Sequence, residues 1–260
     1  MNHLPFFTQE HPIATAHRGG ARLWPENTLV AFREAVELGY RFLETDLHTT
    51  RDGVLVCLHD HWLDRTTDGR GPVWERDWEE VARLDAAHHF RPEEGHPWRG
   101  RGAGVPRLDE VVRELPETYF TLELKQDGIE GPLAELIGRF DLWDRVLVGS
   151  FSDRRLRRFR RLSGGRVVTS AGERESTRVW AASRTGLSLP SRADALQLPM
   201  YRRRTRVVDA RLVAAAHRTG RQVHVWTIDD PETMHELLDL GVDGIITDRP
   251  DILRQVLAQQ

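Results

Sequence analysis

The chain has very few features that would cross-link it or carry it through a membrane. It contains a single cysteine, Cys57, so it cannot form an internal disulfide, which fits a reducing compartment. No run approaches the roughly 18 consecutive apolar residues that a membrane-spanning helix needs. The N-terminal segment Met1–Phe7 also lacks the basic stretch and apolar core of a secretory signal. We therefore expect a cytoplasmic protein without stable membrane insertion.

The chain also lacks a marked excess of charge of either sign. Its 37 Lys and Arg residues nearly balance 40 Asp and Glu residues, which gives a net charge of −3. Without a basic field to attract a polyanion, we predict no nucleic-acid partner. Lysine itself is almost absent, because Lys125 is the only one and the other 36 of these 37 cations are arginines. The composition leaves the oligomeric state open.

Eight short apolar runs alternate with amphipathic, helix-like segments along nearly the whole chain. One such segment, residues 27–36, ends before Gly39, and another, residues 230–240, has Pro231 in its first turn. A barrel of alternating strands and helices uses about 250 residues. The pattern therefore predicts an α/β protein with a (β/α)8 TIM barrel as a single domain over residues 1–260; a doubly wound open sheet is the alternative. The predicted strands are Ile13–His17, Phe42–Leu47, Tyr119–Lys125, Val146–Phe151, Val167–Ala171, Ala195–Pro199, Gln222–Ile228 and Gly244–Thr247.

One further strand, Val54–Asp60, is not preceded by a helix. The dipeptide Asp52-Gly53 before it is typical of a two-residue hairpin loop. With that loop, Asp46 would lie opposite His59. The predicted hairpin would thus return His59 to the level of the carboxylates on the preceding strand.

The long stretch between this strand and the helix predicted at Leu108–Leu115 interrupts the pattern. Residues 61–107 are rich in Trp, Arg, His, Gly and acidic residues, with one helix predicted around Trp78–Leu84. Such a length is uncommon for a connection without structure. We expect a small inserted cap that borders the mouth of the active site.

Three carboxylates fall on predicted strands. Glu44 and Asp46 are two positions apart, so both project from one face, and Glu123 lies near the end of another strand. Buried charges of one sign are costly, and a hard divalent cation bound by carboxylate oxygens is the simplest compensation. A solvated face or pairing with arginines is the alternative. If a metal binds, oxygen ligands favour Mg²⁺ or Ca²⁺ over sulfur-selected zinc.

Two histidines and Lys125 are the remaining candidates for catalysis. His17 and His59 both end predicted strands, and imidazole can take or donate a proton near neutral pH. Lys125 shares a face with Glu123 and could neutralise a phosphate or pair with an acid. Trp226 could line a substrate pocket or belong to the core. The chain shows neither the G-x-G-x-x-G spacing of dinucleotide sites nor a G-x-S-x-G nucleophile elbow.

Taken in order, these motifs resemble the glycerophosphodiester phosphodiesterase family. Each motif is weak alone, but together they span residues 13–250 in order. The motifs are His17-Arg18-Gly19-Gly20, Pro25-Glu26-Asn27-Thr28, Glu44-Thr45-Asp46, His59-Asp60, Leu63-Asp64-Arg65-Thr66-Thr67-Asp68-Gly69-Arg70-Gly71, Leu122-Glu123-Leu124-Lys125, Val225-Trp226-Thr227 and Gly244-Ile245-Ile246-Thr247-Asp248-Arg249-Pro250.

The resemblance implies a TIM barrel that hydrolyses glycerophosphodiesters to glycerol 3-phosphate and an alcohol such as choline or ethanolamine. It implies one divalent cation, Mg²⁺ or Ca²⁺, and a small-molecule glycerophosphodiester as the partner. The implied roles are a metal site of Glu44, Asp46 and Glu123, acid and base roles for His17 and His59, phosphate contacts by Arg18 and Lys125, a glycerol contact by Trp226 and support from Asn27.

The sequence departs from the family pattern in the predicted insertion. Leu84-Asp85-Ala86-Ala87 replaces a segment that often contains glycine, and Val105-Pro106-Arg107-Leu108 carries arginine where threonine is frequent. These changes bear on the substrate range. Two alternatives to this function stay open, a lysophospholipase D-type enzyme and a phosphodiester-binding barrel without turnover. The first would need an apolar entrance, for which the insertion offers Trp62, Trp74, Trp78, Phe90 and Trp98.

Overall fold

A computed structural model, which describes residues 4–187, 189 and 191–259, shows a closed barrel of parallel strands. Around the ring each strand neighbours the parallel strands before and after it in the sequence, and a parallel bridge between Ser170 and Ala195 joins the last pair. The predicted (β/α)8 barrel is confirmed, and closure rules out the open sheet. The barrel strands are β1 (Ile13–Ala16), β2 (Phe42–Thr49), β4 (Tyr119–Leu124), β5 (Val146–Gly149), β6 (Val168–Thr169), β7 (Ala195–Pro199), β10 (Gln222–Trp226) and β11 (Gly244–Thr247).

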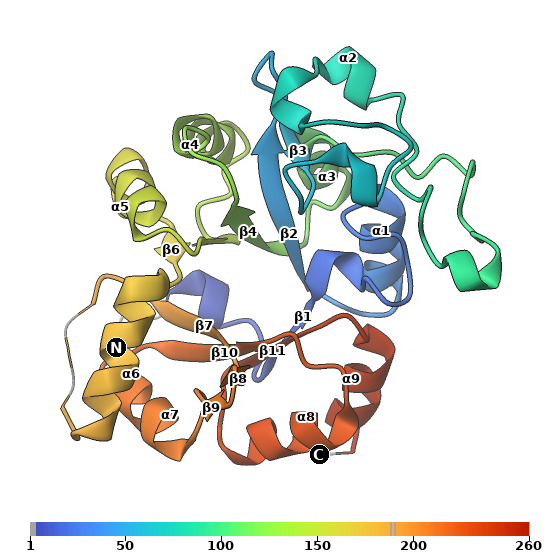
Figure 1. Ribbon diagram of the computed structural model, residues 1–260. Helices are drawn as coiled ribbons and strands as arrows, with labels where there is room; N and C mark the ends of the chain where they lie inside the picture. The colour runs from blue at the N-terminus through green and yellow to red at the C-terminus, as the bar shows by residue number, and fades with distance from the viewer. Residues whose placement is uncertain (1–3, 188, 190, 260) are drawn as a thin grey trace.

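One long helix follows each strand or strand hairpin and covers the outside of the barrel (Figure 1). Side chains cap two of the helix starts: Thr28 Oγ1 accepts a hydrogen bond from Ala31 N, and Asp230 Oδ1 accepts one from Thr233 N. The eight helices are α1 (Leu29–Glu37), α3 (Leu108–Glu114), α4 (Glu130–Arg139), α5 (Asp153–Leu162), α6 (Glu173–Arg184), α7 (Ala210–His217), α8 (Pro231–Asp239) and α9 (Pro250–Leu257).

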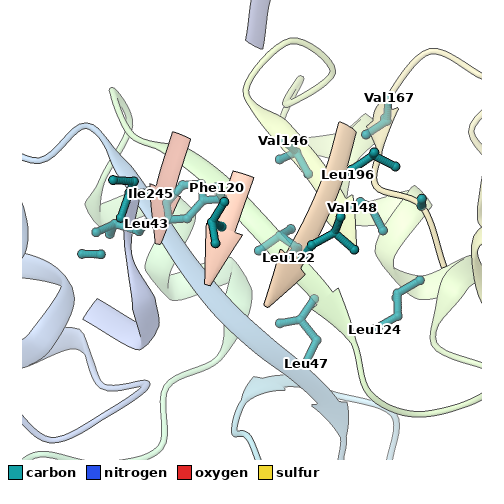
Figure 2. Packing of buried hydrophobic residues seen from close by; sticks show 14 of the residues in the cluster. Leu43, Leu47, Phe120, Leu122, Leu124, Val146, Val148, Val167, Leu196 and Ile245 are labelled. Atoms are coloured by element: carbon teal, nitrogen blue, oxygen red, sulfur yellow. The ribbon is translucent and has the colours of Figure 1, made fainter. Parts of the chain in front are cut away.

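Strand alternation divides the buried apolar side chains of the barrel strands into two sets. One set packs between the strands and the helices, and Figure 2 shows Leu43, Leu122 and Val148 among its members. The other set contains Ile13 and Phe42, from the first positions of β1 and β2, and packs with Phe6 and Phe7 of the short helix η1 (Pro5–Phe7). These residues fill the amino-terminal end of the barrel, so the polar side chains at the carboxyl ends of the strands form its other end.

The predicted hairpin exists, but its predicted register is wrong by one residue. Strand β3 (Leu55–Cys57) pairs antiparallel with β2, with Leu47 opposite Cys57. Leu58 N donates to Asp46 O at 3.0 Å, so Leu58 rather than His59 lies opposite Asp46. The reason is a three-residue loop, Arg51–Gly53, in which Gly53 adopts φ +84°. Glycine tolerates this left-handed conformation, which makes a three-residue loop with a bulge available.

Residues 61–107 are built from short elements that share a small core beside β2 and β3 (Figure 1). The predicted helix is present but shorter than expected, as α2 (Trp78–Val81). The other elements are the 3-10 turns η3 (Leu63–Arg65), η4 (Val73–Glu75) and η5 (Pro92–Glu94). The core residues are Val56, Leu58, Leu63, Val73, Val81, Ala86 and Val105. The division of the chain into a barrel and an inserted cap stays a prediction.

Two smaller features complete the fold. A short hairpin that the sequence pattern did not predict, β8 (Tyr201–Arg202) and β9 (Thr205–Arg206), follows β7. A further 3-10 turn, η2 (His17–Gly19), follows β1. Within the described residues, the helices are all too short or too polar to cross a membrane.

Candidate active site

Three carboxylates meet where β2 and β4 run side by side. Glu44 and Asp46 alternate along β2, and the parallel pairing sets Asp46 level with Glu123 on β4. Oxygen atoms from the three groups lie within 4.8 Å of one another. Glu44 and Asp46 are buried, and Glu123 is half-buried. The residues predicted as metal ligands therefore form one compact cluster.

Two cations lie against this cluster. Lys125 Nζ is 3.1 Å from Asp46 Oδ1 and 2.8 Å from Glu123 Oε2, and Arg18 Nε is 3.1 Å from Asp46 Oδ2. Burial opposes ionisation of Asp46, but Lys125 and Arg18 outweigh it and lower the pKa of Asp46 to about 2. The pairing of basic side chains with the acids, which the sequence left open, is thus present.

The two cations do not balance all three acids. Burial and repulsion from Asp46 raise the pKa of Glu44 to about 8, so its charged form is disfavoured without further positive charge. Asp46 Oδ1 is buried and accepts no hydrogen bond from the residues that the structure describes, and Lys125 Nζ contacts it only as an ion pair. An uncompensated acid and a buried oxygen without a hydrogen bond both fit a hard divalent cation.

His17 is held by a residue from the far end of the chain. Its Nδ1 lies 2.6 Å from Asp248 Oδ1, and its Nε2 lies 3.7 Å from Glu44 Oε2. Burial opposes protonation of the ring, but Glu44 and Asp248 together raise the pKa of His17 above its usual range. Asp248 directly follows β11 and was not predicted as a site residue. Its position at a strand end was the available signal, because the other site residues share that position.

His59 is held in the same way by its own neighbour. Its Nδ1 lies 2.5 Å from Asp60 Oδ1, and Asp60 in turn accepts from Arg65 Nε at 2.5 Å. Burial lowers the pKa of His59 in spite of the attraction of Asp46. With Nδ1 occupied in both histidines, Nε2 is the ring nitrogen left for proton transfer in each.

The first β–α loop brings Arg18 and Asn27 to the same acids. The backbone N–H of Arg18 donates to Glu44 Oε2 at 3.1 Å. Asn27, which is buried, donates from Nδ2 to Asp46 Oδ2 at 3.0 Å and accepts from Thr45 Oγ1 at 2.7 Å. Its contact with Asp46 places Asn27 beside the acid cluster.

Trp226 lies at the end of β10, next to Phe151. Its ring meets Phe151 edge to face at 5.7 Å, and Lys125 Nζ lies 5.8 Å from the Phe151 ring. Phe151 is 55% exposed, which is unusual for a large apolar side chain, and it was not predicted as a site residue. A cavity of about 420 Å³ borders Trp226 and Tyr201. Trp226 could line a pocket or belong to the core, and its position beside a cavity favours the first interpretation.

The fold and the site together define a class of protein. Two carboxylate-bound histidines, three clustered acids and two cations lie at the carboxyl ends of the strands of a (β/α)8 barrel, where barrel enzymes carry their active sites. A sequence model of the "Glycerophosphoryl diester phosphodiesterase family" matches residues 17–252, which is most of the chain. The chain belongs to this family.

Individual relatives agree with the family match. The chain is 41% identical over 256 residues to "Probable glycerophosphodiester phosphodiesterase 2" of Mycobacterium tuberculosis, covering 94% of this chain and 90% of that protein. It is 32% identical to the "Glycerophosphodiester phosphodiesterase" of Caldanaerobacter subterraneus subsp. tengcongensis, covering 93% and 96%. The crystal structure of a glycerophosphodiester phosphodiesterase from Agrobacterium tumefaciens has a TM-score of 0.76 and 27% identity, covering 92% and 97%.

Proposed function

We propose that this enzyme hydrolyses small glycerophosphodiesters to sn-glycerol 3-phosphate and an alcohol, using His17 and His59 as general acid and base and one carboxylate-bound divalent cation. The observation that carries the proposal is the meeting of both histidines, each fixed at Nδ1 by a carboxylate, with the three acids at one end of the barrel. Membership of the family supplies the reaction class.

The cations of the site suit a phosphodiester. Lys125 and Arg18 lie beside the acids, with their charged groups directed at Asp46, and both can contact the nonbridging oxygens of a phosphate. Such contacts stabilise the negative charge that grows on those oxygens in the transition state. Trp226 and Phe151 offer an apolar wall to the carbon skeleton of the glycerol moiety.

The two histidines divide the proton transfers. One ring removes the proton of the attacking hydroxyl through Nε2, and the other donates a proton to the departing alcohol oxygen. The carboxylates of Asp248 and Asp60 fix the ring orientation and the tautomer and stabilise the positive ring when it forms. The attacking hydroxyl is that of a water or of the neighbouring glycerol carbon, which would give a cyclic phosphate first. A diester without that neighbouring hydroxyl is hydrolysed only by the direct route.

Glu44, Asp46 and Glu123 would hold the metal ion. The ion, Mg²⁺ or Ca²⁺, supplies Lewis-acid stabilisation of the phosphoryl oxygens when bound. The three side chains supply only oxygen ligands, and both ions accept these. We further propose that residues 61–107 act as a cap at the substrate entrance, since Arg65 of this segment contacts Glu26 of the first β–α loop.

The first test is glycerol 3-phosphate release from glycerophosphocholine by chelator-stripped protein, with and without added Mg²⁺ or Ca²⁺. The proposal expects release that depends on the ion. Release that is equal with and without ions would refute the metal role. Absence of product with either ion would refute the proposed substrate.

The exposed tryptophans of residues 61–107 justify testing a lysophospholipid as a second substrate. Trp62 and Trp74 are 56% and 38% exposed, whereas Trp78 packs against the small core of this segment. Of the five aromatic residues considered for an apolar entrance, only these two are therefore exposed. A comparison of lysophosphatidylcholine with glycerophosphocholine measures this directly, and we expect the shorter diester to be preferred.

A further inference from the structure

One arginine joins the loop of His59 to the first β–α loop. Arg65 Nε lies 2.5 Å from Asp60 Oδ2, and its two terminal nitrogens lie 2.7 Å from the two oxygens of Glu26. A single guanidinium group therefore holds two carboxylates at once. The bridge links η3, after the β2–β3 hairpin, to the loop that precedes α1.

The two carboxylates differ in what else holds them. Asp60 is bound on its other side to His59 Nδ1 at 2.5 Å, so Arg65 and His59 are its side-chain partners within the described residues. Glu26 also binds Arg18 Nη1 at 3.0 Å, while Arg18 has a second carboxylate partner in Asp46 at 3.1 Å. Loss of Arg65 would leave Arg18 with both of its acids. It would leave Asp60 with His59 alone.

We propose that Arg65 is a positioning residue, which fixes the imidazole of His59 through Asp60 and is itself anchored by Glu26. The proposal rests on the proposed function, because it assigns a step to His59. The proposal adds to the site a residue that does not contact the substrate and whose side chain is half-exposed at the edge of the barrel. A cavity of about 570 Å³ lined by Glu26, Arg65 and Arg91 lies next to the bridge.

The geometry requires arginine in particular. A planar fork with five N–H groups can meet two carboxylates in fixed directions, whereas an ammonium group acts as a point charge. Because small misplacements of a catalytic group cost up to about 100-fold in rate, the main effect of losing the fork is expected in turnover. Substrate affinity should change little, since Arg18 and Lys125 keep their partners.

The test compares Arg65→Ala and Arg65→Lys with Arg76→Ala. Arg76 is a matched control from the same segment: its side chain is 44% exposed against 46% for Arg65, and it also pairs with a carboxylate, at 3.5 Å from Glu80. We expect Arg65→Ala to lower kcat about 10- to 100-fold with KM within about threefold. Arg65→Lys should recover part of this loss, and Arg76→Ala should stay near wild type. Equal kcat in Arg65→Ala and Arg76→Ala would overturn the proposal.

A double-mutant cycle separates positioning from general stabilisation. If Arg65 acts through His59, then Arg65→Ala should cost less than about threefold in kcat when His59 is already alanine, because the effects of groups that act as a unit are not additive. The same fold-loss in both backgrounds would overturn the proposal.

A readout without turnover keeps this proposal distinct from the proposed function. The Nδ1 proton of His59, assigned by its absence from the NMR spectrum of His59→Asn, should shift or broaden in Arg65→Ala and keep its position in Arg76→Ala. An unchanged signal in Arg65→Ala would overturn the positioning role whether or not the wild-type protein cleaves a glycerophosphodiester. If the wild type is inactive while the signal moves, the proposed function fails but the contact to His59 stands.

Discussion

At the scale of single residues, both histidines of the site share one arrangement although they come from distant parts of the chain. Each presents Nδ1 to a carboxylate, His17 to Asp248 and His59 to Asp60. A carboxylate at Nδ1 fixes the orientation of each ring and leaves Nε2 without a hydrogen bond to the described residues, which suits a group that takes or gives a proton at a defined place. The shared arrangement supports the proposed proton transfer through Nε2 of each ring.

The first prediction concerns these rings. His17→Ala and His59→Ala should each lower kcat by about 10²–10⁴, which is the usual contribution of general acid–base catalysis. The measurement is kcat on glycerophosphocholine with saturating ion, with thermal melting as the control for folding. Wild-type turnover in either folded variant would remove that histidine from the acid–base role.

The second prediction concerns the balance of charge in the acid cluster. In the metal-free protein Glu44→Gln should be more stable than wild type, because Glu44 is buried and repelled by Asp46, which raises its pKa to about 8. Each kcal/mol gained in the free energy of unfolding should raise the melting temperature by roughly 2–4 °C in a protein of this size. Added Mg²⁺ or Ca²⁺ should raise the melting temperature of wild type and have little effect on the variant.

A matched control for this variant is Glu130→Gln. Glu130 is also a buried glutamate, but it lies on α4 outside the acid cluster, and its carboxylate accepts from Gly128 N at 2.9 Å. This control should keep the response to the ion. An equal response to the ion in Glu44→Gln and wild type would contradict the assignment of Glu44 as a ligand.

Sequence can indicate which single residues lie close together where position along a strand fixes the direction of the side chain. Glu44, Asp46 and Glu123 could be grouped because alternation and strand ends fix their direction. The contact of His17 with Asp248 spans 231 residues, and no local pattern encodes which acid a ring will meet. The bridge through Arg65 could not be predicted for a similar reason, because its two partners, Asp60 and Glu26, come together only in the folded loops.

At the scale of elements, the site depends on how closely the first β–α loop packs on α1. Gly19 has φ +83°, and a Cβ atom there would lie 2.7 Å from the Cβ of Ala31 and 2.8 Å from its backbone carbon. Only glycine fits both the conformation and the space. This close approach sets the position of Arg18, whose backbone N–H binds Glu44.

The third prediction follows from that contact. Gly19→Ala should lower both the free energy of unfolding and kcat/KM, because the new methyl group must push the loop away from α1. Gly39→Ala is the control: Gly39 has φ +101° but no atom within 4 Å of an added Cβ, so it should cost only about 1–2 kcal/mol of strain and leave kcat/KM unchanged. Urea unfolding and kcat/KM are the measurements. Unchanged kcat/KM in Gly19→Ala would show that the loop tolerates displacement.

Elements were predicted well where their pattern is long and local. The eight barrel strands could be located from apolar runs, but the hairpin register could not, because one additional loop residue shifts every pair of facing residues. Asp52-Gly53 is compatible with loops of two and three residues. The choice between them depends on how β3 packs against the core of residues 61–107, and no dipeptide carries that information.

At the scale of the whole molecule, the interior of the barrel changes from apolar to charged along its axis. Phe6, Phe7 and Phe42 fill the amino-terminal end, and the acids and histidines lie at the other. His224 on β10 lies at the boundary: its side chain is 1% exposed, its Nε2 is 2.8 Å from Gln222 Oε1, and its ring meets Phe7 edge to face. This position suits a neutral imidazole. A protonated ring would place a buried positive charge beside the aromatic side chain of Phe7, which is unfavourable.

The fourth prediction is therefore that acid destabilises the protein in part through His224. Burial lowers the pKa of His224 from 6.5 to about 4. As the pH falls below 6.5, the unfolded chain takes up a proton at this residue before the folded protein does, so the contribution of neutral His224 to stability is present above pH 6.5 and is lost towards pH 4. Between pH 7 and pH 5 the loss amounts to about 2 kcal/mol.

The measurement is the free energy of unfolding in urea at pH 7 and pH 5 for wild type and His224→Gln, whose amide stays neutral at both values. The variant should lose about 2 kcal/mol less than wild type over this interval, even if its stability at pH 7 is lower. Burial also lowers the pKa of His48 to about 4, but His48 is present in both proteins, so its effect cancels in the comparison. If the two proteins lose equal stability, then protonation of His224 does not drive acid unfolding. The buried position of His224, between the aromatic residues at the amino-terminal end and the acids, would then have to accommodate a positive charge.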